Sequence, residues 1–236
     1  MAVSAPLGEY LATGLHIPRS KISIIQNGVR VPQALPRGDI LEARAELGID
    51  VRARVIGSLG RFQRIKGYHR LIDAFAMVRD NAGPEFAPIV LLLAGDGPER
   101  AQLEAQVSSL DLGDFVKFVG WRNDTQRLLE LMDVFVLPSD SEGTSLALLE
   151  AMASGTAVVA TAVGGTPDVI GSSEAGRLIA PGNTRALAGA ILESLADGAE
   201  RQAMGLRGRA RIEQQFSFEA MARAYLDLYK TLIHHD

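Results

Sequence analysis

The 236-residue chain is 47% hydrophobic and 22% charged, carries a formal net charge of −4 and contains no cysteine. This composition predicts a globular domain with a sizeable core and excludes an intrinsically disordered chain. The mildly acidic balance argues against a nucleic-acid partner, the lack of cysteine excludes disulfides and thiolate zinc sites, and no apolar run reaches the roughly 20 residues that span a bilayer. We therefore expect a cytoplasmic protein with no indication of membrane contact.

Short apolar runs alternate with longer amphipathic segments along nearly the whole chain. We predict strands at residues 21–26, 53–59, 88–95, 115–120, 133–138, 156–161 and 176–180. Helical patterns lie at residues 39–47, 67–80, 98–109, 124–131, 145–153, 166–170, 183–196, 198–215 and 217–233. Alternation at this spacing indicates βαβ crossovers. The expected fold is α/β, a single Rossmann-like, doubly wound parallel sheet of about six strands.

After the last predicted strand the chain is helical throughout. Residues 198–236 are predicted to form C-terminal helices packed on the sheet domain. In an open, doubly wound sheet, ligands bind at the carboxyl ends of the strands. The loops that leave the strands are therefore where functional residues are expected.

The segment GSLGRFQRIKG follows a predicted strand and opens a helix. It contains two glycines, Gly60 and Gly67, and three cations, Arg61, Arg64 and Lys66. It matches neither GxxxxGK[ST] nor GxGxxG, so an ordinary nucleoside triphosphatase or dinucleotide fold is not indicated. Cations beside a helix N-terminus suit a diphosphate, with Arg61 as a bidentate fork and Lys66 as a point charge. A solvated basic turn is the alternative interpretation.

A second glycine-rich turn, GDGPER, follows the strand predicted at residues 88–95. Gly95 and Gly97 either let a ligand approach the backbone or make a tight turn before the next helix. The residues alone leave both possibilities open.

Two glutamates lie close to the helix that follows the strand predicted at residues 133–138. Glu142 is in the loop SDSEG, and Glu150 is about two turns into the apolar helix SLALLEAMA. The neighbours of Glu150 leave no polar face for a carboxylate, so its charge needs a partner. At 1.5 Å per residue the two carboxylates are roughly 12 Å apart, too far to act together on one bond. They are expected to contact different parts of a long ligand.

The N-terminus of this helix, near Thr144 or Ser145, lies between the glutamates. It offers free N–H groups at Gly143 to Ser145 and the positive end of the helix dipole, which favour an anion. A nucleotide sugar has the matching shape, with ribose at one end, a diphosphate in the middle and a hexose at the other end. The alternative is that both glutamates lie in solvent.

Several segments together resemble a known family. SEGTSLALLEAMASGTAVVAT is similar to the E-x7-E region of glycosyltransferase family 4, which comprises retaining enzymes of the GT-B fold, and GSLGRFQRIKG resembles their G-R-x4-K-G phosphate loop. IIQNGV, LLLAGDGPE, VKFVGWRND and AVGGTPDVI fall in the order and spacing of that family. The resemblance extends over residues 3–233 and implies the donor-binding, C-terminal half of a GT-B fold.

The resemblance implies roles for individual residues. Glu142, Arg61 and Lys66 are the expected catalytic set, in which the two cations contact the diphosphate and Glu142 positions the hexose hydroxyls. Glu150 is expected to bind the ribose hydroxyls. The other expected substrate-binding residues supply backbone N–H groups near the phosphates, line the site or meet the base: Gly143, Thr144, Ser145, Gly60, Gly95, Gly97, Trp121 and Arg122.

The chain departs from the family in two respects. Thr144 and Ser145 stand where phenylalanine and glycine are usual, and such short polar side chains can cap the helix instead. The family's N-terminal half, which carries the acceptor site, has no counterpart in this chain. Residues 1–236 are therefore expected to be a donor-binding domain, excised or at the end of a longer enzyme, without turnover of its own.

The expected function is the transfer of a hexose, with retention of configuration, from a UDP-, GDP- or ADP-sugar to an unidentified acceptor. No cofactor or metal ion is expected, because no Asp-x-Asp motif is present. Two alternatives remain from the residues. One is a non-catalytic nucleotide-sugar-binding domain, and the other is a GT-B relative with different chemistry, such as a sugar-nucleotide epimerase.

Overall fold

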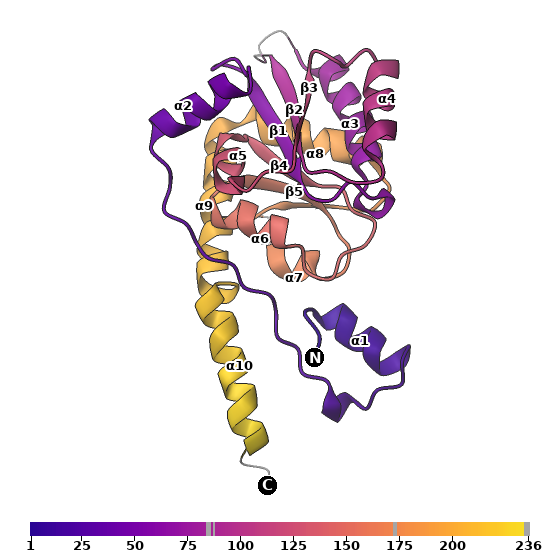
Figure 1. Ribbon diagram of the computed structural model, residues 1–236, viewed down its shortest axis with the longest axis vertical. Helices are drawn as coiled ribbons and strands as arrows, with labels where there is room; N and C mark the ends of the chain where they lie inside the picture. The colour runs from indigo at the N-terminus through magenta and orange to yellow at the C-terminus, as the bar shows by residue number, and fades with distance from the viewer. Residues whose placement is uncertain (84–85, 87, 172–173, 234–236) are drawn as a thin grey trace.

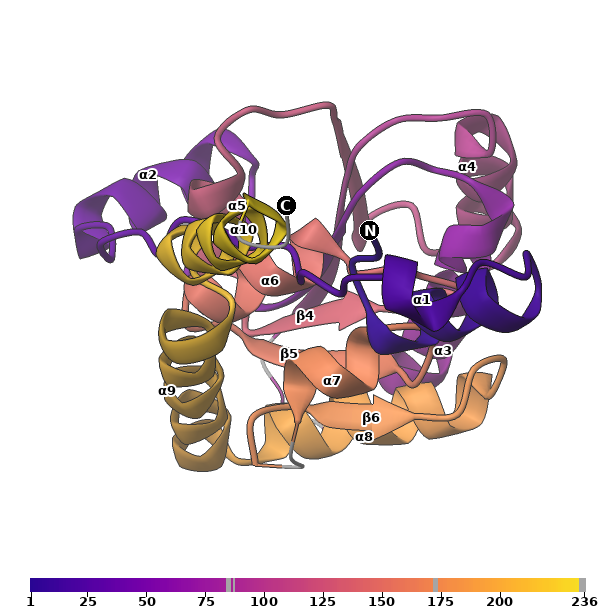
Figure 2. The ribbon, with the colours of Figure 1, turned by 90° about the horizontal axis from the view of Figure 1, so that it is seen from below.

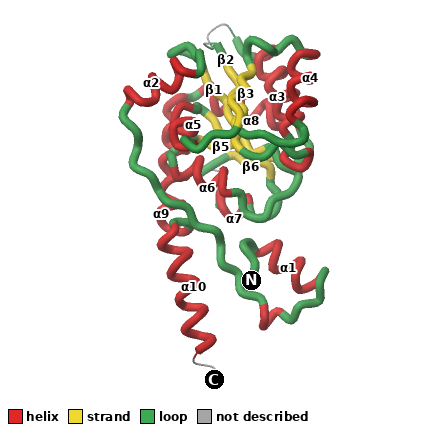
Figure 3. The backbone as a smooth tube through the Cα atoms, in the orientation of Figure 1, coloured by secondary structure: helices red, strands yellow, loops and turns green. Residues whose placement is uncertain are grey.

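The computed structural model describes residues 1–83, 86, 88–171 and 174–233 (Figure 1). Its centre is one parallel sheet of six strands in the order β3-β2-β1-β4-β5-β6, surrounded by helices (Figure 3). The strands are β1 (Arg54–Leu59), β2 (Ile89–Ala94), β3 (Val116–Gly120), β4 (Val134–Leu137), β5 (Ala157–Thr161) and β6 (Arg177–Ile179). The predicted α/β fold with about six parallel strands is confirmed.

Helices cover both faces of the sheet (Figure 2). One hydrophobic cluster includes residues of α2 (Arg37–Glu46), α5 (Thr125–Leu131), α6 (Leu146–Ala153), α7 (Thr166–Ile170) and α9 (Gly198–Gln215). The other includes residues of α3 (Tyr68–Asn81), α4 (Arg100–Ser109) and α8 (Thr184–Ala196). Successive strand residues point to opposite faces, so Val55 of β1 packs in the first cluster and Ile56 in the second. All six residues of β2 are buried, which explains its continuous apolar sequence.

The strand predicted at residues 21–26 is wrong. The segment forms one isolated parallel bridge, between Ile24 and Ala2, through the Ser23 carbonyl and the Ile25 N–H, and Ile24 is 49% exposed. The segment lies apart from the sheet, beside α1 (Ala5–Thr13) and the short 3-10 helix η1 (Arg19–Lys21) (Figure 1). An apolar run becomes a strand only where a sheet edge is available to pair with it.

Helix α1 has no counterpart among the predicted helices. Ser4 caps it by accepting a hydrogen bond from the Leu7 N–H, and Pro6 occupies the first turn. A capping serine followed by a first-turn proline is a start signal that is visible in the sequence.

The two C-terminal helices differ in how they pack. Helix α9 buries Met204 and Ile212 beside the sheet domain and brings Gly205 into close contact with the backbone of Gly155. Helix α10 (Phe218–Ile233) has no buried residue and extends away from the sheet, joined to the rest of the domain near Ser217 (Figure 1). The predicted helical region runs to residue 236, and residues 234–236 lie outside the described residues.

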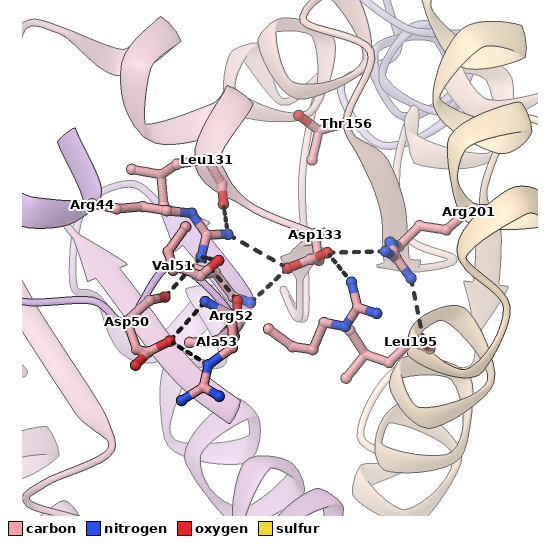
Figure 4. A network of polar contacts seen from close by, with 12 residues as sticks. Arg44, Asp50, Val51, Arg52, Ala53, Leu131, Asp133, Thr156, Leu195 and Arg201 are labelled. Carbon is pink, nitrogen blue, oxygen red and sulfur yellow. Dashed lines mark hydrogen bonds and ion pairs between the residues drawn. The ribbon is translucent and has the colours of Figure 1, made fainter. Parts of the chain in front are cut away.

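A cluster of charges fixes the amino end of the sheet. The carboxylate of Asp133, which directly precedes β4, lies 3.0 Å from Arg201 of α9, 3.3 Å from Arg54 of β1 and 3.8 Å from Arg44 of α2. It also accepts the backbone N–H of Val55 at 2.9 Å. Figure 4 shows Asp133 between Arg44 and Arg201. Through these contacts one carboxylate links two helices and the two central strands. The side chain of Asp133 is only 13% exposed.

Replacing Asp133 with asparagine is expected to destabilise the fold. The change leaves three guanidinium groups around a neutral amide, and breaking a mostly buried ion pair on one side costs about 3–5 kcal/mol. Urea denaturation followed by circular dichroism should give a free energy of unfolding that is lower by about 2–4 kcal/mol. This loss is smaller than that for a fully buried ion pair because Arg54 is partly exposed.

Asp227→Asn is the matched control, because that carboxylate is 75% exposed and pairs only loosely with Lys230. It should leave the denaturation midpoint unchanged. Equal midpoints for Asp133→Asn and Asp227→Asn would contradict the linking role of Asp133.

Candidate functional site

A cavity of about 470 Å3 opens at the carboxyl ends of β1, β2 and β3. The strand ends form one wall, and the first turns of α5 and α6 form the other. The lining residues are Leu59, Gly60, Arg61, Ala94, Gly95, Asp96, Trp121, Arg122, Thr125, Ala147 and Glu150. The cavity is therefore where a doubly wound sheet places its ligands.

The cavity brings together about half of the residues that the sequence singled out. Gly60, Arg61, Gly95, Trp121, Arg122 and Glu150 line it, whereas Lys66, Glu142, Gly143, Thr144, Ser145 and Gly97 do not. Sequence reasoning missed Leu59, Ala94, Asp96, Thr125 and Ala147. Leu59 and Ala94 are the last residues of their strands, so their place beside the cavity could have been predicted from the strand ends. Ala147 precedes Glu150 by three positions and shares its helix face, so helical spacing could have predicted Ala147.

The glycines beside the cavity are needed for loop packing. Gly95 has φ +135°, and a Cβ there would overlap the carbonyl oxygen of Gly60 in the neighbouring loop. A Cβ at Gly97 would press on the backbone of Phe62 at 2.5 Å. The backbone of the two loops is also joined by the Gly60 N–H to the Ala94 carbonyl at 3.0 Å. Gly95 therefore lines the cavity and also packs closely on the neighbouring loop, whereas Gly97 does not line the cavity and is explained by its close packing on Phe62.

Glu150 is a half-buried charged residue of α6, and burial raises the pKa of its carboxyl above the ordinary value of 4.5. Within the described part of the chain, its carboxylate has no hydrogen-bond or ion-pair partner from the protein, and its oxygens remain in contact with solvent. Glu150 lines both the main cavity and an adjoining one of about 350 Å3 beside residues 28–32. An acceptor of two hydrogen bonds is thus presented to the cavity without a donor from the protein.

Lys66 and Glu142 contact each other directly. The Lys66 Nζ lies 2.7 Å from Oε1 and 2.9 Å from Oε2 of Glu142, and the buried Ser139 hydroxyl donates to Oε1 at 2.7 Å. Lys66 ends the 3-10 helix η2 (Arg64–Lys66) after β1, and Glu142 lies in the loop after β4. Strands β1 and β4 are neighbours, so their following loops meet.

Of the two short polar residues before α6, Ser145 caps the helix and Thr144 does not. The helix begins at Leu146, slightly later than predicted, and the Ser145 hydroxyl accepts the Leu148 N–H at 3.4 Å. The Thr144 hydroxyl donates to the Val3 carbonyl at 2.7 Å and so attaches the N-terminal segment to this loop. Among the described residues, the N–H groups of Thr144 and Ser145 have no protein acceptor. This end of the helix can therefore bind an anion.

Trp121 and Arg122 form the outer end of the cavity. Trp121 is 77% exposed, and the Arg122 guanidinium donates two hydrogen bonds to the Asp124 carboxylate, at 2.7 and 2.6 Å. These hydrogen bonds raise the pKa of Arg122 and lower the pKa of Asp124. Because the Arg122 side chain is held by Asp124, its backbone is the part that is free to meet a ligand.

Within residues 1–83, 86, 88–171 and 174–233, no group of three or more histidine, aspartate or glutamate side chains is arranged to hold a metal ion. In the same ranges, no helix combines the length and apolar character needed to cross a membrane. This edge of the sheet presents the cations Arg61 and Lys66, the N-terminus of α6, and the carboxylates of Glu142 and Glu150.

Replacing Glu150 with glutamine is expected to stabilise the unliganded protein. Above its raised pKa the carboxyl is charged in both the folded and unfolded states, and the folded state alone bears the cost of partial burial. Below about pH 4 the carboxyl is neutral in both states and the cost disappears. The melting temperature of the variant should exceed that of the wild type by on the order of 1–2 °C at pH 7, because a half-exposed carboxylate keeps much of its hydration, and the gap should close below pH 4. A variant that melts lower than the wild type at pH 7 would mean that Glu150 has a stabilising partner.

Comparison with known proteins places the chain in a family. The family described as "Glycosyl transferases group 1" matches residues 39–211. The chain is 36% identical over 185 residues to the lipopolysaccharide core biosynthesis glycosyltransferase LpsE of Rhizobium meliloti (strain 1021), a match that covers 78% of this chain and 52% of LpsE. The chain thus spans about half the length of this relative.

Solved structures share the fold. Sucrose-phosphate synthase from Thermosynechococcus elongatus is 32% identical with a TM-score of 0.83, covering 100% of this chain and 58% of that one. Anabaena Alr3699/HepE, in complex with UDP-glucose, is 26% identical with a TM-score of 0.87, covering 99% of this chain and 63% of that one. The chain therefore belongs to the group 1 glycosyl transferases, and its parallel sheet with flanking helices is that of the GT-B glycosyltransferases.

Proposed function

We propose that this chain is the donor-binding part of a retaining glycosyltransferase that moves a hexose from a nucleoside diphosphate sugar to an acceptor without a metal ion. The observation that carries the proposal is the unpartnered, half-buried carboxylate of Glu150 in a cavity beside a cationic loop and a free helix N-terminus. No described protein group donates a hydrogen bond to this carboxylate, and the two hydroxyls of a ribose can supply donors in place of water.

The rest of a nucleotide sugar fits the charges around Glu150. The base lies against the backbone of Trp121 and Arg122 at the outer end of the cavity. The diphosphate lies at the N-terminus of α6, within reach of Arg61 and Lys66, and the hexose lies toward Glu142. HepE, whose fold this chain shares, has been crystallised with UDP-glucose, which supports a nucleoside diphosphate sugar as the ligand.

The chemistry that these residues can assist is cleavage of the bond between the anomeric carbon and the diphosphate oxygen. Negative charge grows on the leaving diphosphate as this bond breaks, and donors fixed in advance stabilise it. Arg61, Lys66 and the N–H groups at the start of α6 are such donors. Glu142 positions the hexose hydroxyls and does not act as a pair with Glu150.

The proposed role of this chain does not include binding the acceptor. This chain matches about half the length of LpsE and 63% of the HepE chain. We place the acceptor site and the remaining catalytic groups in the part of such proteins that this chain does not match. The chain by itself is then expected to bind the donor without transferring the sugar.

Calorimetric titration with UDP, GDP and ADP tests the donor site. One of them should bind, and Arg61→Ala should weaken that nucleotide about tenfold or more, because a hydrogen bond to a charged group contributes about 1.5–3 kcal/mol. Arg64→Ala is the matched control, since Arg64 is an exposed cation of the same loop that does not line the cavity. Its effect should stay within about twofold.

Glu150→Ala tests the ribose contact in the same titration. It should weaken the bound nucleoside diphosphate by a similar factor but leave the weak binding of inorganic pyrophosphate unchanged, because pyrophosphate has no ribose. If no nucleoside diphosphate binds the wild-type chain, or if Arg61→Ala and Glu150→Ala both keep full affinity, the proposed donor site is wrong.

A further inference from the structure

Two residues of the proposed donor site, Lys66 and Glu142, form a salt bridge with each other. Glu142 is 6% exposed and receives two contacts from the Lys66 ammonium, at 2.7 and 2.9 Å, plus the Ser139 hydroxyl at 2.7 Å. Lys66 is 28% exposed, and among the described residues Glu142 is its one acidic partner. The cation expected to hold a diphosphate is thus neutralised before any ligand arrives.

The loops that carry this salt bridge are tied to each other independently of it. The Asp140 N–H donates to the Ile65 carbonyl at 2.8 Å, a backbone contact that does not depend on the Asp140 side chain. Gly67, at φ +71°, leaves no room for a side chain against the carbonyl of Pro138. The loops therefore keep Lys66 and Glu142 facing each other, and only the flexible lysine side chain can turn toward a ligand.

A carboxylate in this position opposes a bare diphosphate. To bind the phosphates, the Lys66 ammonium must share or leave Glu142, and the carboxylate charge then lies close to the phosphate charges in a partly desolvated site. A hexose changes this balance, because its hydroxyls donate hydrogen bonds to the carboxylate and replace the lost ammonium contacts. Once the hexose has gone, the sugar hydroxyls left on the nucleotide are those of the ribose, which the proposed site places at Glu150 and not at Glu142.

We propose that Glu142 is an internal counterion that competes with the diphosphate for Lys66, so that the site retains an intact nucleotide sugar and releases the spent nucleoside diphosphate. This role rests on the proposed donor site and extends it to product release. It assigns Glu142 two states: bound to hexose hydroxyls when donor is present, and bound to Lys66 when the site is empty or holds only the nucleotide.

The test measures the affinity for UDP by calorimetry in Glu142→Gln and in a matched variant, Asp140→Asn. Glu142→Gln keeps the shape of the side chain but frees Lys66, and UDP should bind about five- to tenfold more tightly than to the wild type, with a larger gain at low ionic strength. Asp140→Asn removes the same charge from the same loop but from a carboxylate that pairs with Arg70, so its affinity for UDP should change by less than about twofold. The gain should vanish in the Glu142→Gln, Lys66→Gln double variant.

A second readout is the preference for donor over product. The ratio of the affinities for UDP-glucose and UDP should fall in Glu142→Gln, because the amide still accepts hexose hydroxyls but no longer repels the bare diphosphate. A melting temperature within a few degrees of the wild type shows that the variant is folded. Equal or weaker binding of UDP by a folded Glu142→Gln would overturn the inference.

Inorganic pyrophosphate separates this inference from the proposed function. If the wild type binds no nucleotide but Glu142→Gln binds pyrophosphate more tightly than the wild type does, the counterion role stands and the nucleotide site fails. If nucleotide binds but neither UDP nor pyrophosphate gains affinity in Glu142→Gln, the counterion role fails and the nucleotide site stands. If neither ligand binds any variant, both are wrong.

Discussion

The adjacency of β1 and β4 at the middle of the sheet is the constraint on which the site depends. In the order β3-β2-β1-β4-β5-β6, the chain moves outward from β1 to β3 on one side and from β4 to β6 on the other. The register pairs Ile56 with Val134 and Gly57 with Phe135, so the two strands run side by side and parallel. The loops that follow β1 and β4 therefore leave the same edge of the sheet. That reversal point is where an open α/β sheet binds ligands. It brings the cationic loop after β1 next to the loop of Glu142, although 76 residues separate Lys66 from Glu142.

The carboxylates at the two ends of the sheet differ in how many protein partners they have. At the amino end, Asp133 is surrounded by three arginines and a backbone N–H, so its carboxylate is fully supported and serves stability. At the carboxyl end, Glu150 has no partner among the described residues, and burial raises its pKa. Buried charges are normally paired, and an unpaired one in a cavity marks a place where a ligand completes the set. Between these extremes lies Glu142, which is paired with Lys66, the cation that we propose also binds the diphosphate.

The sequence was sufficient for much of this structure and insufficient for specific parts of it. Continuous apolar runs such as IVLLLA identify the central strands, because strands buried on both faces need no polar residues. The run at residues 21–26, KISIIQ, contains three isoleucines but has no sheet edge to join, a fact that only the assembled topology reveals. Arg61 and Glu150 could be selected from loop position and from the apolar surroundings of the glutamate. The Lys66–Glu142 contact and the Asp133 cluster could not, because each joins segments far apart in the chain. Gly97 was selected as a lining residue, whereas close packing against Phe62 explains it.

A crystal structure of the chain with UDP is the direct test of the proposed donor site, because it locates the ribose and the diphosphate separately. We expect the ribose hydroxyls within about 3.2 Å of the Glu150 carboxylate and the diphosphate at the N-terminus of α6 beside Arg61. UDP bound elsewhere on the chain, or bound in the cavity with its ribose turned away from Glu150, would contradict it.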